Sequence, residues 1–252
     1  MERKHHPLFH ALWDLDSQST SVALQDESYD LGLTLDYPSV AAGGPKTSLN
    51  PVFFAISRMY AVGINDTHIV ELLLNHGFSA ISQIQPGIRT SAMHVACRLE
   101  RPWRIFWRDR NSPFEAICQL TCRQRAIQDQ GGVDFQDDDG NTALHFAAKN
   151  AIPPSALEVL LSLGADPNKP NSSGQTPLHI AIDGYRDDIV VCLCKHGGDI
   201  NSRLPDGTDC LSLARDHLAA EASKTETAPR LKANATSCKQ AILDRLIELQ
   251  AK

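Results

Sequence analysis

The chain has no long apolar segment and no excess of positive charge. No run of about 18 apolar residues occurs among its 252 residues, so we expect no membrane-spanning helix. The apolar stretch near the N-terminus is short and is interrupted by His10 and Asp14, unlike a secretory signal. The net charge of −6 disfavours a broad surface for nucleic acid or for an anionic membrane. We therefore expect neither kind of partner.

A disulfide framework is also missing. The seven cysteines are odd in number and scattered along the chain, which is typical of reduced, packed thiols. Without an export signal, this pattern favours a cytoplasmic or nuclear protein.

Motifs of catalysis and cofactor binding are absent as well. The chain contains no G-x-S-x-G, no H-E-x-x-H and no glycine-rich dinucleotide loop. The segment GGPKTS (43–48) approaches a phosphate-binding loop, but Pro45 separates Gly44 from Lys46 and breaks the required G-K-[ST]. We expect no enzyme activity and no cofactor.

What the chain does contain is an internal repeat. The decapeptide GNTALHFAAK (140–149) returns 34 positions later as GQTPLHIAID (174–183). A looser copy, GTDCLSLARD (207–216), follows 33 positions after that, and two degenerate copies precede the pair, NPVFFA (50–55) and SAMHVA (91–96). Such a unit cannot bury its own apolar face, so neighbouring units must stack.

These segments resemble the ankyrin repeat, whose period is about 33 and whose signature is T-P-L-H-x-A. The resemblance covers about 46–217 and is strongest over 132–217. It implies an all-α solenoid of about five helix-turn-helix units with short β-hairpin finger loops, which form one repeat domain over 46–252. Residues 1–45 do not match and are expected to be partly disordered or capping. The expected units are about 46–80, 81–133, 134–167, 168–200 and 201–252, the last with a capping helix at 238–250.

The repeated polar residues are expected to be structural. Thr142 and Thr176 precede the first helix of their units, where a hydroxyl suits the N-cap. The resemblance implies that His94, His145 and His179 bond loop backbone. They recur once per unit, roughly 10 Å apart, which is too far to share a metal ion. We therefore expect no metal site.

An insertion interrupts the second unit at 99–112. His94 and His145 are 51 positions apart, about 18 more than one period, and the delayed second helix is predicted to begin at Pro113 and to run through about 127. The insertion holds Trp103, Arg104 and Trp107, residue types that are enriched at binding hot spots. Two interpretations stay open, a partner contact and a buried aromatic stripe.

The resemblance also implies where a partner would bind, namely the finger tips and the row of first helices. Many of the corresponding side chains are acidic, which predicts a protein partner with a basic segment and salt-sensitive binding; each Asp equally suits a turn. The positions are Asp138, Asp139, Asn141, Lys149, Asn150, Ser172, Ser173, Gln175, Asp183, Gly184, Tyr185, Arg186 and Asp206.

The sequence thus favours a non-catalytic adaptor or scaffold, with a monomer as the favoured state. A fold does not fix a function, and two alternatives remain. One is a small-molecule-binding or catalytic protein with a pocket at the 99–112 insertion. The other is the substrate receptor of a larger complex, although no recruitment motif is recognisable.

Overall fold

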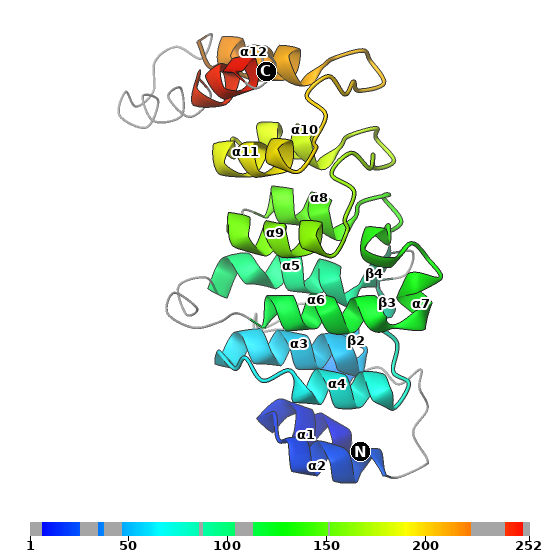
Figure 1. The fold of residues 1–252 in the computed structure, drawn as a ribbon. Coiled ribbons are helices and arrows are strands. Elements are labelled where there is room, and N and C mark those ends of the chain that lie inside the picture. Colours follow the sequence, from blue (N-terminus) through cyan, green and yellow to red (C-terminus); the bar gives the residue numbers. More distant parts are fainter. Residues whose placement is uncertain are drawn as a thin grey trace. The chain divides into compact units, whose positions relative to one another are not determined.

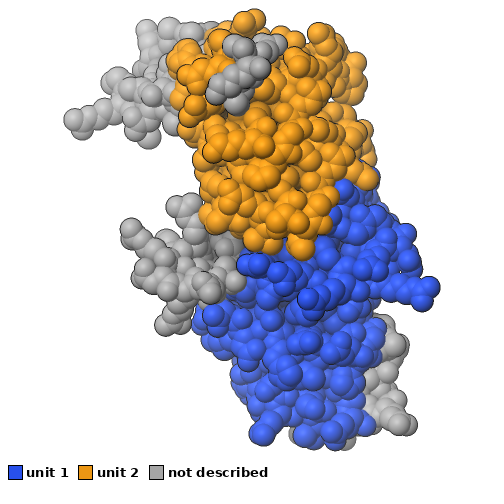
Figure 2. All heavy atoms as spheres, viewed as in Figure 1, with its two compact units in different colours: residues 1–138 blue, residues 139–252 orange. Residues whose placement is uncertain are grey.

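The structure is a computed structural model that forms two compact units, residues 1–138 and residues 139–252 (Figure 2). Both units are built mainly from helices, which confirms the predicted all-α class. No helix among the described residues is long and apolar enough to cross a membrane. The residues described are 7–25, 35–37, 47–85, 88–103, 113–150, 152–222 and 240–248.

The first unit consists of helices and two antiparallel hairpins, β1–β2 and β3–β4 (Figure 1). Helix α5 packs on both α3 and α6, while α1 packs on α3 and α2 packs on α4. Its elements are α1 (Pro7–Asp14), α2 (Ser17–Leu24), β1 (Leu35–Tyr37), β2 (Thr47–Leu49), α3 (Pro51–Val62), α4 (His68–Asn75), β3 (Ile81–Gln85), β4 (Ile88–Ser91), α5 (Ala92–Trp103), α6 (Phe114–Arg123), α7 (Arg125–Gln128) and the 3-10 turn η1 (Gly132–Asp134).

The second unit stacks helix pairs, with α8, α10 and α12 in one row and α9 and α11 in another (Figure 1). Residues 240–248 form a further α-helix, in which Ile242 and Leu246 are buried. The elements are α8 (Ala143–Lys149), α9 (Pro154–Ser162), α10 (Pro177–Asp183), α11 (Asp187–Lys195) and α12 (Cys210–Ala222).

The repeated sequence builds these pairs by capping and burial. Thr142 and Thr176 occupy the N-caps of α8 and α10, as predicted. Ala147 and Ala181 are fully buried, and their small side chains let neighbouring helices approach closely. Fully buried leucines fill the space between the rows, each worth roughly 1.5–3 kcal/mol of transfer free energy; they are Leu144, Leu157, Leu160, Leu178 and Leu193.

The N-terminal segment contains a helix pair. Its second half, SQSTSVAL, is polar, yet it forms α2, because the Asp16 carboxylate accepts hydrogen bonds from the backbone N–H groups of Gln18 and Ser19. The pair is fastened to α3 by Arg58, which donates to the Trp13 carbonyl at 2.8 and 3.1 Å and lies 4.2 Å above the Trp13 ring. Residues 7–24 therefore cover the first repeat with a helical hairpin.

The second helix of the second repeat, at about residues 81–133, departs from the expected single long helix. Pro113 occupies the N-cap of α6, and the helix ends at Arg123 because Gln124 adopts an extended conformation (φ −68°, ψ 126°). A separate short helix, α7, follows. The predicted helix from Pro113 to about residue 127 is thus divided in two.

Candidate functional site

A polar cavity of about 530 Å³ lies in the second unit, between two finger loops and the helices α8 and α10. We call it the groove. It brings together many of the predicted partner-binding residues, from fingers and first helices alike. The groove is lined by Asp139, Asn141, His145, Phe146, Lys149, Asn171, Ser172, Ser173, Gln175, Ile180, Asp183 and Gly184.

The two fingers that border the groove are joined by hydrogen bonds. The Ser172 N–H donates to the Asp139 carbonyl at 3.0 Å, and the Asn171 side-chain amide donates to Asn141 Oδ1 at 3.0 Å. Asn171 Oδ1 also accepts from the N–H groups of Ser173 and Gln175, which closes its own loop. The rim is therefore held in one arrangement before any ligand arrives.

Gly140 is required where these fingers meet. Its φ of +74° is left-handed, and a Cβ there would lie 2.6 Å from the Ser172 nitrogen. A side chain would therefore push the two fingers apart as well as strain the backbone.

His145 lines the groove and is hydrogen-bonded through both of its ring nitrogens. Its Nδ1 accepts a hydrogen bond from the Thr142 N–H at 3.1 Å, so the proton of the neutral ring lies on Nε2, which donates to the Gln175 carbonyl at 3.0 Å. The ring is buried, and burial lowers the pKa of His145 although the Gln175 carbonyl opposes this. His145 therefore couples its own repeat to the finger of the next.

His179 repeats only half of this arrangement. Its Nδ1 accepts from the Thr176 N–H at 3.2 Å, but its buried Nε2 makes no hydrogen bond of normal geometry. Burial lowers the pKa of His179; the Asp183 carboxylate, the Ser202 carbonyl and Asp206 oppose the shift without reversing it. In the first unit, His94 Nδ1 accepts from the Ser91 N–H at 3.3 Å, as the motif predicts.

The groove has an apolar floor and charged walls. Phe146 and Ile180, at equivalent positions of two repeats, are half-buried there. Lys149 is exposed and makes no ion pair or hydrogen bond with the described residues. Asp139 and Asp183 also line the cavity, so the lining carries both signs of charge.

Asp183 is held by a chain of side chains. Its Oδ2 accepts from Gln175 Nε2 at 3.2 Å, and its Oδ1 lies 2.9 Å from His217 Nε2. If Nε2 of the neutral His217 ring donates to Asp183, then Nδ1 accepts from the Tyr185 hydroxyl, 3.2 Å away. The chain joins α10, its loop and α12 beside the groove.

Several of the predicted acidic residues are occupied within the protein. In the first unit, Asp138 accepts from the Arg89 N–H and lies 3.9 Å from its guanidinium. The predicted residue Arg186 forms a 3.0 Å ion pair with Asp188, so this carboxylate is engaged as well. The free acidic surface is therefore smaller than the count of carboxylates in the sequence indicates.

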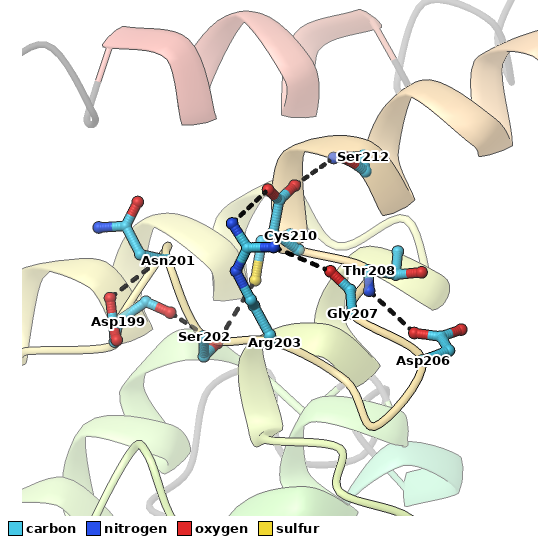
Figure 3. A network of polar contacts seen from close by, with 10 residues as sticks. Asp199, Asn201, Ser202, Arg203, Asp206, Gly207, Thr208, Cys210 and Ser212 are labelled. Atoms are coloured by element: carbon cyan, nitrogen blue, oxygen red, sulfur yellow. Dashed lines mark hydrogen bonds and ion pairs between the residues drawn. The ribbon is translucent and has the colours of Figure 1, made fainter.

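Asp206 belongs to the last finger, outside the groove (Figure 3). Its Oδ1 accepts from the Thr208 N–H at 2.9 Å, and this bond lowers the pKa of Asp206. Arg203 donates to the Gly207 carbonyl at 3.2 Å and lies 4.0 Å from Asp209, whose carboxylate accepts from the Ser212 N–H. Asp206 shapes a turn here, which is the role that Asp residues commonly have in loops.

The remaining predicted residues lie beside the groove or outside the described part. Asn150 caps the end of α8, and Arg186 donates to the Ile152 carbonyl at 3.1 Å, which ties two repeats together. Tyr185 adopts a left-handed φ of +55°. Trp103 ends α5, and Arg104 and Trp107 lie outside the described residues, as does most of the 99–112 insertion.

A protein-family model described as "Ankyrin repeats (3 copies)" matches residues 110–204. This segment contains the groove and both complete copies of the T-x-L-H motif. These repeats are ankyrin repeats. The recognition made from the sequence is confirmed, and the ankyrin finger and first-helix positions are those that line the groove.

Curated relatives share the ankyrin repeats over a short length. The rice BTB/POZ domain and ankyrin repeat-containing protein NPR3 is 36% identical over 90 residues, which are 36% of this chain and 15% of that protein. The human transient receptor potential cation channel subfamily A member 1 is 39% identical over 80 residues, 31% of this chain and 7% of the channel. The match thus spans less than a sixth of either relative.

The fold extends well beyond the matched segment. The crystal structure of the ankyrin repeat domain of Bcl-3, a member of the IkappaB protein family, superposes with a TM-score of 0.64 at 20% identity. The superposition covers 98% of this chain and 87% of that domain. The ankyrin-repeat fold is thereby confirmed.

Three groove residues and one neighbour were not predicted from the sequence. Phe146 and Ile180 directly follow the motif histidines His145 and His179. The register of the repeat was therefore sufficient to place them near the fingers. Asn171 had no such signal, whereas Gly184 was among the predicted first-helix positions. His217 reaches Asp183 from α12, where the repeat pattern has already loosened. Among the described residues, no three His, Cys, Asp or Glu side chains gather as metal ligands.

Proposed function

We propose that this protein is a non-catalytic interaction module, an adaptor or scaffold, that binds a partner protein in the groove. Ankyrin repeats generally mediate protein–protein interaction, and this chain carries them. The observation that supports the groove as the site is its construction, a cavity of about 530 Å³ with an apolar floor and a hydrogen-bonded polar rim.

The proposed partner presents a basic segment. Two carboxylates and one ammonium line the groove, and the whole chain carries a net charge of −6. The net negative charge attracts a cationic peptide, and this electrostatic attraction weakens as the salt concentration rises. We further propose that the protein acts as a monomer in the cytoplasm, the nucleus or both.

The test uses the full 252-residue chain as bait for a displayed library of random linear peptides. Selected peptides are titrated against the wild type and against Ser173→Arg, which places a large cation on the exposed rim. We expect the variant to lose at least about tenfold in affinity, with unchanged helical circular dichroism. Ser155→Arg, which makes the same charge change at an exposed position of α9 outside the groove, is the matched control and is expected to bind as the wild type does.

Peptides that bind the Ser173→Arg variant as tightly as the wild type would overturn the assignment of the groove. Recovery of no peptide above background would overturn the proposal that this chain binds linear protein segments at all. Repetition at low and high salt separates a basic segment, whose binding weakens with salt, from an apolar one.

A further inference from the structure

The charges in the groove do not balance. Asp139 and Asp183 contribute two negative charges, and Lys149 contributes one positive charge. His145 is held neutral in the lining, because its Nδ1 accepts from the Thr142 N–H while its Nε2 donates to the Gln175 carbonyl. The groove therefore has a surplus of one negative charge, which one cation would neutralise.

Asp183 is arranged to receive that cation. Hydrogen bonds from Gln175 and His217 fix one lone pair on each of its oxygens. An ionised carboxylate offers about four such acceptor sites, so acceptor capacity remains on a group whose orientation is already set. A cation bound there costs little further ordering of the protein side chain.

The floor adds a requirement on the shape of the occupant. Phe146 and Ile180 are half-buried, one in each repeat, between the two fingers. A long aliphatic stem covers such a floor, and a planar guanidinium also stacks on an aromatic ring, which a compact ammonium does less well. The acceptors on the rim and walls suit a group with several N–H donors.

We infer that the groove takes one arginine side chain from an extended partner segment. Its stem lies on Phe146 and Ile180, its guanidinium is directed to the carboxylates, and Lys149 opposes it as the cation of the lining that limits affinity. The inference rests on the proposed function and names the residue that the groove recognises. Lys149 then determines specificity. It repels an arginine side chain, whereas it would be the main attraction for an acidic side chain.

The decisive experiment replaces Lys149 by Gln in the full chain. The probes are N-acetyl-arginine N-methylamide, the corresponding citrulline compound, which is neutral and nearly isosteric, and the corresponding glutamate compound. Binding is followed by backbone amide shifts of residues 139–149 and 171–184 in NMR titrations up to about 50 mM, a range suited to millimolar ligands. Lys169→Gln makes the same charge change outside the groove and is the matched control.

We expect the wild type to bind the arginine compound at least about fivefold more tightly than citrulline, as one net ion pair allows. Lys149→Gln should tighten arginine binding by about two- to fivefold, whereas Lys169→Gln should leave it unchanged. Asp183→Asn and, separately, Asp139→Asn should reduce arginine binding toward that of citrulline. The second variant keeps the test valid if the first disturbs the His217 contact.

Equal binding of arginine and citrulline, preferred binding of glutamate, weaker arginine binding in Lys149→Gln, or no shift with any probe would each overturn the inference. The displayed peptides test the proposed function independently of this titration. If those peptides still depend on Ser173 but contain no required arginine, the groove binds a partner by other chemistry. If they are insensitive to Ser173, both proposals fail.

Discussion

Two copies of one motif, TALHFA and TPLHIA, differ in how fully their histidines are bonded. His145 and His179 both accept a hydrogen bond at Nδ1 from the threonine three residues earlier. Only His145 donates from Nε2 to the following finger, through the Gln175 carbonyl; the same atom of His179 is buried without such a bond. The local cap is thus a property of the motif, while the bond between repeats depends on the next finger.

The largest effect expected from this difference is on stability. His145→Ala removes the cap bond and the bond to Gln175, and leaves a cavity, so we expect a loss of about 3 kcal/mol in the free energy of unfolding. His179→Ala should cost about 1 kcal/mol less, since one of the two bonds is not made. Urea unfolding followed by circular dichroism measures both. Equal losses would show that the Gln175 contact contributes nothing.

The fingers that contain Gly140 and Gly207 offer a second comparison. Gly140→Ala places a Cβ against the Ser172 backbone and strains a left-handed residue, so we expect a loss of about 2 kcal/mol. Gly207 in the last finger has a similar φ of +87° but open space around it. Gly207→Ala should therefore cost only the backbone strain, about 1 kcal/mol. Thermal unfolding of the two variants would contradict this account if Gly207→Ala were the worse.

Acid should weaken the fold through both histidines. Burial lowers their pKa values in the folded state, so below about pH 6.5, the ordinary value for histidine, the unfolded chain binds more protons. The stabilisation is present in full above that pH and is lost as the pH falls toward the folded pKa values. Between pH 7.5 and pH 5, the free energy of unfolding should fall less for His145→Gln than for the wild type. An unchanged slope would exclude His145 as a contributor.

The smallest effect should come from Asp206. Its carboxylate is engaged by the Thr208 N–H in the last finger and does not line the groove. Asp206→Asn is therefore expected to bind the selected peptides like the wild type, whereas Asp183→Asn binds them more weakly. Isothermal titration of one peptide against both variants decides the matter. A comparable loss in Asp206→Asn would extend the binding surface to the last finger.

The repeats and their caps were predictable because the interactions that make them are close in sequence. Thr142 and His145 are three positions apart, and Pro177 begins its helix where no N–H is missed. The helix α2 escaped prediction because its serines and threonine are weak helix formers; the Asp16 cap and packing against α4 overcome this. The break at Gln124 likewise had no signal in the apolar spacing.

The candidate site was predictable only in part. The finger and first-helix positions followed from the repeat register, and Asp139, Gln175 and Asp183 do line the groove. The acidic surface is smaller than the sequence indicated, because Asp138 pairs with Arg89, 49 positions away, and Asp206 has the turn role that the sequence left open. Trp103, Arg104 and Trp107 stay a prediction.

The sequence by itself determined the period, the helix caps and the residues that face the core, since each depends on groups within a few positions of one another. Only the tertiary structure decided which histidine reaches the next finger, which carboxylates are already bonded, and that Lys149 shares the lining of one groove with Asp139 and Asp183. Those outcomes depend on atoms roughly one repeat apart along the chain, whose approach is set by the stacking of whole helices rather than by local preference.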